Sequence, residues 1–492
     1  MCSADSKPDL LVTLFTQGAL AACREEAMRR LSTGNATGPH PLDPLLPVAE
    51  QLNRRDDLIG LVIACQEEHP EDCRLLELSA TLHMQTGAFD EAGRAIDAAL
   101  ARRPAHLPAL AIQARLLTQA GRLDEALRVL ERIQELNPDN PSNLSNIAYL
   151  RIALGDVDEA LNLYRQSILR QPNHPQMRLN YSIALLKAGY FQQGWAEHEW
   201  RFRLPGHTTL PMNRLLPNIT PRLDLQGRQV LVTQEEGFGD TLMYLRYLPL
   251  LAARGAIIRV WGAENMATLC ARVEGVHHVQ VGGETPSYDY HCPFISLPRA
   301  FSATAHPFGV PVPYVRADPD GISRFAALMP EDGRLRVGLV WSGAPRPDQS
   351  DAWMLDQRRS MKLEALAPLL DLDRTTFYSL QIGEAARQRL AYAGRIVDLT
   401  DRIGTMDDTA ALVANLDIVV SVDTAMVHLA GAMGKPVILM DRVNPCWRWM
   451  SDRTDSPWYP TLRIIRQSRA WQWEDVVAQV RTRLEQFRRN AS

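Results

Sequence analysis

The chain has 492 residues, of which 46% are hydrophobic and 22% are charged, and its formal net charge is −4 at pH 7. This length is enough for two to four domains that each bury a core, and the composition is ordinary for a soluble globular protein. The net negative charge argues against a general nucleic-acid binder, although a local basic groove stays open as an alternative.

The cysteines and the N-terminus indicate a cellular compartment. Seven cysteines are scattered along the chain without a CxxC pair, which favours a reducing environment over a disulfide framework or a zinc site. Residues 1–11 lack the basic flank and apolar core of a signal peptide, and no stretch approaches 18 uninterrupted apolar residues. We therefore expect a cytoplasmic protein without a membrane span and without a metal site.

Residues 1–202 are dominated by an internal repeat. Gly87, Gly121, Gly155 and Gly189 are each 34 residues apart, and similar phrases surround them, such as TGAFDEA, AGRLDEA and LGDVDEA. The period and the phrases resemble the tetratricopeptide repeat, which is a pair of antiparallel helices. In this interpretation the glycine closes the first helix, the acidic pair begins the second, and the following alanine allows close helix packing.

Three full repeats are expected at about residues 73–106, 107–140 and 141–174. A fourth begins at Pro175 but has Gly194 and Trp195 where the packing alanine and its neighbour should be. The residues before the first full repeat are expected to form a cap. Arrays of this kind bind peptides or partner proteins on a concave face. The alternative is that the array only dimerises the protein or braces the second half.

The second half has the pattern of parallel α/β layers. Residues 203–224 are proline-rich and predict a linker laid over a surface, and two domains are expected at 225–332 and 333–492. The first should open with a strand at Val230–Gln234, the glycine turn EEGFGD, and a helix at Thr241–Ala253. Later segments predict strands at 256–261 and 278–281, a helix near 265–273 and an edge at 289–298.

The last domain should contain the second turn of interest. The first strand is expected in LRVGLVWSG, which ends in Trp341, Ser342 and Gly343. After it we expect a polar loop up to Ser360, helices near 363–370 and 384–393, strands at 376–381 and 396–399, and a terminal helix at 472–488. A buried strand at 416–420, a turn, a helix at 425–433 and a strand at 437–440 form the SVDTAMVHLAGAMGKPV segment. Free N–H groups and the dipole of such a helix can bind a phosphate. A helix cap at Asp423 and a structural His428 are the plain alternatives.

Several phrases taken together resemble a known family. These are QEEGFGDTLMYLRYLPLL, VGLVWSG, RRSM, YSLQIG, SVDTAMVHLAGAMGKPV, NPCWRWM and DSPWYPTLRIIRQ. They resemble the bacterial tetratricopeptide-repeat glycosyltransferases, whose catalytic half is similar to the heptosyltransferases. The resemblance implies an α-helical tetratricopeptide-repeat solenoid followed by an α/β GT-B fold, in which two Rossmann-like domains face a cleft. It also implies inverting, metal-independent transfer from a nucleotide-sugar, with no cofactor.

The resemblance implies roles for particular residues. Asp240 would be the general base, Asp423 would bind ribose or donor-sugar hydroxyls, and Arg359 would face the diphosphate. Ala344 and Ile382 depart from the family pattern, where Asn and Lys are frequent. The complete donor-binding set comprises Gly237, Gly239, Trp341, Ser342, Gly343, Arg359, Ser360, Gln381, Ser421, Asp423, Thr424, Ala425 and His428.

Three functions remain open at this point. The leading interpretation is transfer of a sugar to a hydroxyl of a protein acceptor that the repeats present, with flagellin as the specific expectation, because proteins of this layout glycosylate flagellin. The second is transfer to a lipopolysaccharide or polysaccharide. The third is a repeat scaffold with a vestigial nucleotide-sugar site. Self-association through the repeats stays open.

Overall fold

The structure is a computed structural model that describes residues 9–33, 40–208, 210–235, 237–302, 304, 307–346 and 349–491. By its internal contacts the chain divides into two compact units. Unit 1 consists of residues 1–154 and 345–355, and unit 2 of residues 155–344 and 356–492. This division does not test the four limits expected from the sequence, which stay predictions.

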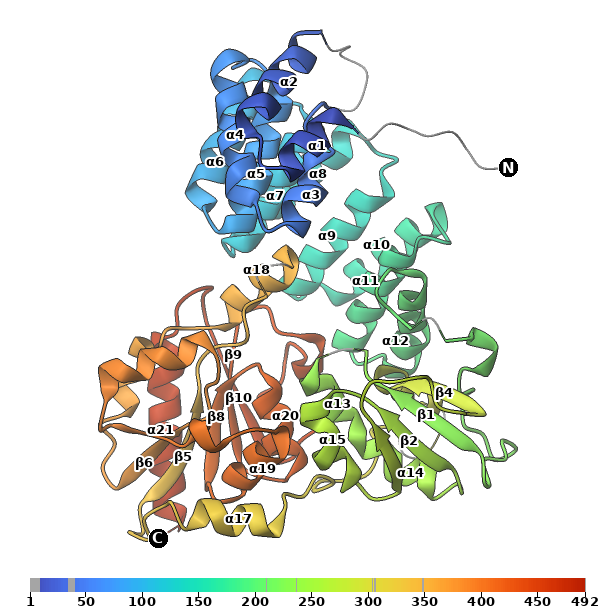
Figure 1. Ribbon diagram of the computed structural model, residues 1–492, viewed down its shortest axis with the longest axis vertical. Helices are drawn as coiled ribbons and strands as arrows, with labels where there is room; N and C mark the ends of the chain where they lie inside the picture. Colours follow the sequence, from blue (N-terminus) through green and yellow to red (C-terminus); the bar gives the residue numbers. More distant parts are fainter. Residues whose placement is uncertain are drawn as a thin grey trace. The chain divides into compact units, whose positions relative to one another are not determined.

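Unit 1 is helical and contains the first repeats (Figure 1). Helices α1–α4 enclose a core around Leu11, Phe15 and Leu58, and from α5 onward the helices pack in sequential pairs, α5 with α6 and α7 with α8. The bounds are α1 (Leu10–Thr16), α2 (Leu20–Thr33), α3 (Leu45–Gln51), α4 (Arg55–Glu68), α5 (Cys73–Thr86), α6 (Phe89–Arg102), α7 (Leu107–Gln119), α8 (Leu123–Leu136) and α9 (Pro141–Leu154).

The glycines of the repeat period adopt the backbone conformation that the repeat interpretation requires. Their φ angles are +82° at Gly87, +77° at Gly121, +98° at Gly155 and +84° at Gly189. In this left-handed region a side chain is strained, so each glycine ends one helix and lets the chain reverse. Acidic pairs then begin α6, α8 and α10 (Val157–Arg170). The helix-pair prediction is confirmed.

The prediction of a polar loop before Ser360 is wrong in one respect, because this segment contains a helix, α18 (Ser350–Arg359). Its Met354 is buried in an apolar cluster with Ala80, Met84 and Ala92 from the repeat helices, and Trp353 packs against that cluster. A Cβ atom on Gly87 would lie 2.6 Å from the Trp353 ring. Sequence reasoning missed this because the apolar partners lie more than 200 residues away in the chain.

In unit 2 the remaining repeat helices precede the linker. They are α10, α11 (Pro175–Lys187) and α12 (Phe191–His198), followed by the 3-10 turns η1 (Glu199–Arg203) and η2 (Met212–Arg214). Residues 203–224 have little regular structure otherwise. The N–H of Leu216 donates to the carbonyl of His291 at 2.8 Å, and that of Ile219 to the carbonyl of Ala300 at 2.8 Å. These two hydrogen bonds attach the segment to β4 (Tyr290–Pro293) and α16 (Leu297–Phe301), while its role as a linker stays a prediction.

The first α/β layer is a four-stranded parallel sheet in the order β3-β2-β1-β4 (Figure 1). One long helix was expected after β1, but the chain forms two short helices separated by a 3-10 turn, because Pro249 lacks the N–H that would continue the first. The strands are β1 (Gln229–Thr233), β2 (Ile257–Trp261), β3 (Val276–Gln280) and β4 (Tyr290–Pro293), and the helices are α13 (Phe238–Tyr244), η3 (Leu245–Tyr247), α14 (Leu248–Ala252), α15 (Glu264–Ala271), η4 (Phe294–Ser296) and α16 (Leu297–Phe301).

The second layer is a six-stranded parallel sheet in the order β10-β9-β8-β5-β6-β7. One face packs under α21 and η5, and the other under α19 and α20. The segments expected as helices at 363–370 and 384–393 are 3-10 helices. The elements are α17 (Pro319–Ala326), β5 (Leu335–Val340), η5 (Leu363–Leu369), β6 (Thr375–Ser379), η6 (Glu384–Tyr392), β7 (Ile396–Asp398), η7 (Thr400–Arg402), α19 (Met406–Ala414), β8 (Ile418–Val422), α20 (Ala425–Ala432), β9 (Val437–Asp441), η8 (Trp447–Trp449), β10 (Leu462–Arg466) and α21 (Glu474–Ala491).

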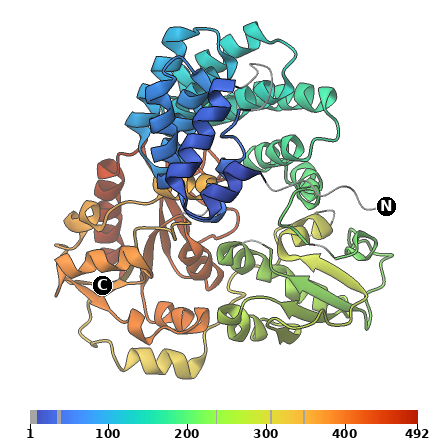
Figure 2. The same ribbon diagram turned by 45° about the horizontal axis from the view of Figure 1, so that its top comes forward.

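Helix α17 joins the end of the first layer to the second and lies along α19 (Figure 2). Gly321 is its contact point, since a Cβ there would lie 3.0 Å from Ala411. Among the described residues no helix combines the length and the apolar character that a membrane span requires.

The fourth repeat yields a stability prediction at its packing position. Gly194 lies in α12 against α11, where a Cβ would be 2.7 Å from Leu186 Cδ2 and 3.1 Å from the Leu186 main-chain nitrogen. We expect Gly194→Ala to lower stability by about 1–3 kcal/mol, because overpacking displaces the helix. Calorimetric unfolding of the purified variant and of the unmodified protein measures this loss of stability.

The matched control is Gly93→Ala, which alters a glycine inside another repeat helix, α6. A Cβ there meets nothing within 4 Å, so the substitution should be neutral or stabilise by up to about 1 kcal/mol through helix propensity. Equal effects at both positions would contradict the packing argument.

Candidate functional site

The glycine turn after β1 and the turn between β8 and α20, both singled out in the sequence, meet in the structure. Helix α13 follows β1, α20 follows β8, and the two helices pack against each other. A Cβ on Gly239 would lie 2.9 Å from His428 Cδ2 and 3.6 Å from the Ala425 Cα. Because the strands of both sheets are parallel, both turns lie at carboxyl edges, where α/β proteins bind ligands. Gly239 therefore permits the close approach that brings the two edges together.

Asp240 forms an ion pair with Arg448 of η8 through its Oδ1 atom. The Arg448 guanidinium also lies over the Trp447 ring, 4.6 Å from the ring centroid. Within the described residues, the Oδ2 atom of Asp240 makes no hydrogen bond. The predicted base therefore has a cationic neighbour that sequence reasoning did not single out, although NPCWRWM contains it.

His428 is buried between aromatic side chains. Its ring stacks on Trp449 with centroids 5.3 Å apart, and its Nδ1 lies 3.0 Å from the Tyr459 hydroxyl. Burial, and then the positive charge of Arg448, lower the pKa of His428 to about 4. The ring is therefore neutral at pH 7 and packs the domain, while its role in donor binding stays a prediction.

Asp423 is also buried and already has partners. Its Oδ1 accepts a hydrogen bond from Trp449 Nε1 at 2.9 Å, and its carbonyl accepts one from Arg359 Nη1 at 2.9 Å. Burial alone would raise the pKa of Asp423, but the charges of Arg442 and then Arg359 hold that pKa below its ordinary value. The carboxylate is therefore ionised, and its main chain is held by a cation.

The predicted residues after β5 form one hydrogen-bonded turn. Gln381 Oε1 accepts from the N–H groups of Trp341 and Ser342 at 3.1 and 2.9 Å, and Ser360 Oγ accepts from the Gly343 N–H at 3.0 Å. Any Cβ on Gly343 would overlap Asp356. The structure thus brings these residues together around a glycine whose Cβ would displace the Asp356–Arg359 pair.

Arg359 is fully engaged at that turn. Its Nε and Nη2 each lie 2.9 Å from Asp356 Oδ1, and its Nη1 donates to the Asp423 carbonyl. Asp356 is buried and was not singled out in the sequence. Arg359 therefore holds the turns after β5 and β8 together, and whether it also faces a diphosphate stays a prediction.

The turn between β8 and α20 is held by hydroxyl groups. Ser421 Oγ lies 3.1 Å from Thr424 Oγ1, and Thr424 Oγ1 accepts from the Met426 N–H at 3.3 Å as the N-cap of α20. This cap satisfies one N–H of the first turn, so others in that turn can bind an anion. Thr424 and not Asp423 is the cap, contrary to the plain alternative.

The remaining expected positions, Gly237, Ala344 and Ile382, are less constrained by their surroundings. Gly237 has an extended backbone with φ −66°, and a Cβ there would meet only Asp240 Oδ2, at 4.0 Å. Ala344 and Ile382, the two departures from the family pattern, are both exposed. No described residues form a cluster of three or more His, Cys, Asp or Glu side chains that could hold a metal ion.

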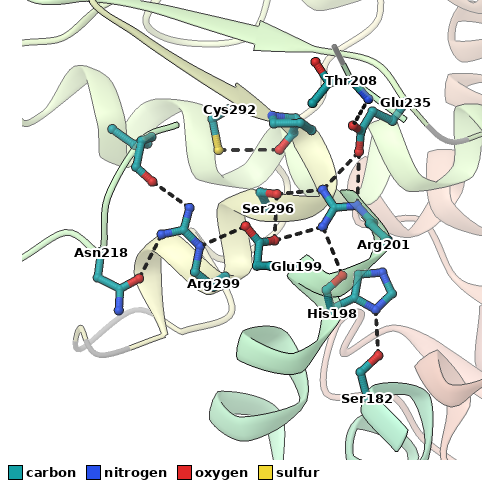
Figure 3. Close-up of polar contacts among 12 residues, drawn as sticks. Ser182, His198, Glu199, Arg201, Thr208, Asn218, Glu235, Cys292, Ser296 and Arg299 are labelled. Carbon is teal, nitrogen blue, oxygen red and sulfur yellow. Dashed lines mark hydrogen bonds and ion pairs between the residues drawn. The ribbon is translucent and has the colours of Figure 1, made fainter. Parts of the chain in front are cut away.

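A buried polar network lies beside the first glycine turn (Figure 3). Arg201 is 1% exposed and donates to Glu235 from Nε and Nη2 at 3.1 and 3.0 Å, to Glu199 at 2.9 Å and to Ser296 at 2.7 Å. Glu235 also accepts from the Thr208 N–H at 3.1 Å. Glu235, the first residue of the EEGFGD turn, is thereby tied to the end of the repeats.

The buried neutral state of His428 makes the free energy of unfolding depend on pH. Its folded-state pKa of about 4 lies below the ordinary value of 6.5, so between these values the unfolded chain binds a proton that the folded chain does not. The free energy of unfolding therefore falls as pH drops below 6.5. Between pH 7.5 and 5.0 the free energy of unfolding should therefore fall by about 2 kcal/mol less in His428→Gln than in the unmodified protein.

Urea unfolding at both pH values measures this difference. His278→Gln, which alters an exposed histidine on β3, is the control and should show the pH dependence of the unmodified protein. An unchanged pH dependence in His428→Gln would contradict the buried neutral state.

Comparisons with known proteins cover both halves of the chain. Residues 380–472 match the model of a family described as glycosyltransferase family 9 (heptosyltransferase). Residues 67–148 and 146–193 match two models described as tetratricopeptide repeat. The family 9 match includes the β8–α20 turn and η8.

The individual proteins that the chain resembles have low sequence identity to it. Protein FlbA of Caulobacter vibrioides is 24% identical over 353 residues, which are 65% of this chain and 58% of that protein. The chain therefore spans less than two thirds of that relative. The structure of Escherichia coli ADP-heptose lipopolysaccharide heptosyltransferase II covers 54% of this chain and 99% of its own, with 15% identity and a TM-score of 0.41. A tetratricopeptide-repeat protein of Thermus thermophilus covers 37% of this chain and 92% of its own, with 20% identity and a TM-score of 0.31.

The family matches agree with the glycines of the repeat period and with the two parallel sheets, as the GT-B expectation requires. The chain joins tetratricopeptide repeats to a glycosyltransferase family 9 (heptosyltransferase) domain.

Proposed function

We propose that the protein is a glycosyltransferase that moves a sugar from a nucleotide-sugar donor to a hydroxyl group of a protein acceptor, with inversion at the anomeric carbon. The observation that supports this best is the meeting of α13 and α20. It brings Asp240 to the β8–α20 turn, which lies within the family 9 match. A carboxylate and an anion-binding turn in one place are what such a transfer needs.

Asp240 is the base in this proposal. Its Oδ1 is held by Arg448, which leaves Oδ2 to take the proton from the acceptor hydroxyl as that oxygen attacks the anomeric carbon. The bond from that carbon to the diphosphate breaks on the opposite side, so one displacement inverts the configuration. Arg448 is a positioning residue, because it orients the carboxylate without touching the sugar.

The leaving diphosphate gains negative charge as its bond breaks. N–H groups at the start of α20 are fixed donors for that charge, and they need no reorganisation during the reaction. We propose that these groups and nearby cations stabilise the leaving group without a metal ion.

The protein acceptor follows from the repeats, since such arrays bind peptides and proteins. On unit 1, a groove of about 870 Å³ lies between α6, α7 and α8 and includes Arg94, Arg128, Asp97 and Leu117 among its lining residues. It contains side chains of both charge signs beside apolar ones, which suits a polypeptide. Flagellin is the first acceptor to test.

A lipopolysaccharide or polysaccharide acceptor is the second candidate, favoured by the heptosyltransferase description of the matched family. Incubation of a lysate with labelled nucleotide-sugars separates the two candidates. Label in protein, and in purified flagellin in particular, is expected. Label confined to lipid or glycan would favour the second candidate, and no binding of any nucleotide would favour a scaffold.

Asp240→Asn should lower the rate of transfer by about 100-fold or more, because general base catalysis contributes that much. Glu264→Gln, which alters an exposed carboxylate in the same layer, should keep the rate. Melting temperatures of both variants test folding separately. A folded Asp240→Asn enzyme with full activity would remove Asp240 as the base.

Chelation tests the metal-independent step. The rate with EDTA should stay within about twofold of the rate with Mg²⁺ or Mn²⁺, whereas a required metal supplies several kcal/mol of charge stabilisation. A loss of activity in EDTA that Mg²⁺ or Mn²⁺ restores would overturn this part of the proposal.

A further inference from the structure

Among the described residues, two buried cations beside the site have no carboxylate in an ion pair with them. Lys187, the last residue of α11, and Arg442, directly after β9, are each 8% exposed. Lys187 Nζ donates to Asn444 Oδ1 at 2.7 Å, and Arg442 Nε donates to the Asn444 carbonyl at 2.7 Å. Neither cation has an ion pair among the described residues. Burying two positive charges beside one amide costs free energy unless an anion binds between them.

Arg442 retains an unused donor. Its Nη1 is buried and makes no hydrogen bond within the described residues. A buried guanidinium N–H without an acceptor is rare, because it forfeits a strong charge-assisted bond. This donor is therefore available to a ligand atom.

The position of Arg442 follows from strand register. In the parallel pair β8 and β9, Val422 lies opposite Met440. Arg442 comes two residues after Met440, and Thr424 comes two residues after Val422, so both follow neighbouring strands at the same sheet edge. Arg442 also exerts the strongest attractive charge on Asp423. It is therefore a neighbour of the β8–α20 turn.

Lys187 reaches this edge because the fourth repeat packs on it. Trp195 of α12 contacts Trp447 edge to face, with ring centroids 5.1 Å apart. A Cβ on Gly189 would lie 3.3 Å from the Met450 methyl group. Arg359, the cation predicted from the sequence, is by contrast occupied by Asp356 and the Asp423 carbonyl.

We propose that Lys187 and Arg442 form a binding site for a phosphate group of the sugar donor, so that the fourth repeat supplies part of the donor site. This inference rests on the proposed function for the identity of the ligand. A phosphate oxygen would accept from Arg442 Nη1 and neutralise the ammonium of Lys187. The repeat array is then part of the donor-binding half as well as a surface for an acceptor.

The site also predicts a pH dependence. Burial, and then repulsion from Arg442, lower the pKa of Lys187 to about 8; Arg466 lowers that pKa further, and Cys446 and Asp441 oppose the shift. Below this value Lys187 is charged in the free protein. Above it the lysine must gain a proton to bind the anion, so affinity should fall by up to about tenfold per pH unit.

Calorimetric titration of the full chain with UDP, GDP, ADP and inorganic pyrophosphate tests the proposal. At pH 7.5 we expect Arg442→Gln and Lys187→Met each to weaken binding of the nucleotide that binds by at least about tenfold. Lys187→Met should not lower the melting temperature, because it removes a buried charge, and it should abolish the fall in affinity between pH 7.5 and 9.5. Arg453→Gln, which alters an exposed arginine paired with Asp455, is the matched control and should bind normally.

The outcomes separate this inference from the proposed function. A nucleotide that binds the unmodified protein and both variants equally would overturn the inference and leave the function standing. If pyrophosphate binds in a way that depends on Arg442 but no nucleotide binds, the result would support the anion site. It would overturn the proposal that the donor is a nucleotide-sugar. No binding of any probe would overturn both.

Discussion

The close approach of α13 to α20 is the constraint on which the rest of the site depends. Gly239 has no side chain, so the His428 ring can lie where a Cβ would otherwise be. The contact brings the carboxyl edges of two separate parallel sheets together. The turns that end β1 and β8 can then act on one ligand. His428 completes this contact as a neutral, stacked ring, which adds no charge to a region already rich in arginine.

Several buried charges at this edge are arranged in pairs. Arg448 holds Asp240, Arg359 holds Asp356, and Arg466 holds the buried Asp441 at 3.1 Å. Each pair orients a turn, since a buried ion tolerates few positions for its partner. Lys187 and Arg442 both donate to Asn444, and neither has an ion pair in the part of the chain that the structure describes. The paired cations hold turns in place, and in our proposal Lys187 and Arg442 bind an anionic group of the ligand.

Prediction from sequence succeeded for local features and failed for long-range ones. The glycine period located the repeat helices, and apolar runs located strands such as β1, β8 and β9 within about two residues. It missed α18, whose Trp353 and Met354 look like isolated apolar residues in a polar loop until the distant helices that cover them are known. It also missed Arg448, Arg201 and Asp356, because nothing in a short phrase shows which carboxylate a given arginine will meet.

The sequence by itself determined the repeat phase, the positions of strands such as β1, β8 and β9, and the two turns that carry the candidate site. These depend on periodicity and on backbone conformations set within a few residues, such as the positive φ at Gly87. Only the tertiary structure decided which charges meet. Asp240 and Arg448 are 208 residues apart, and Lys187 and Asn444 are 257 apart. Such pairs arise from the packing of whole elements, and no local pattern encodes that packing.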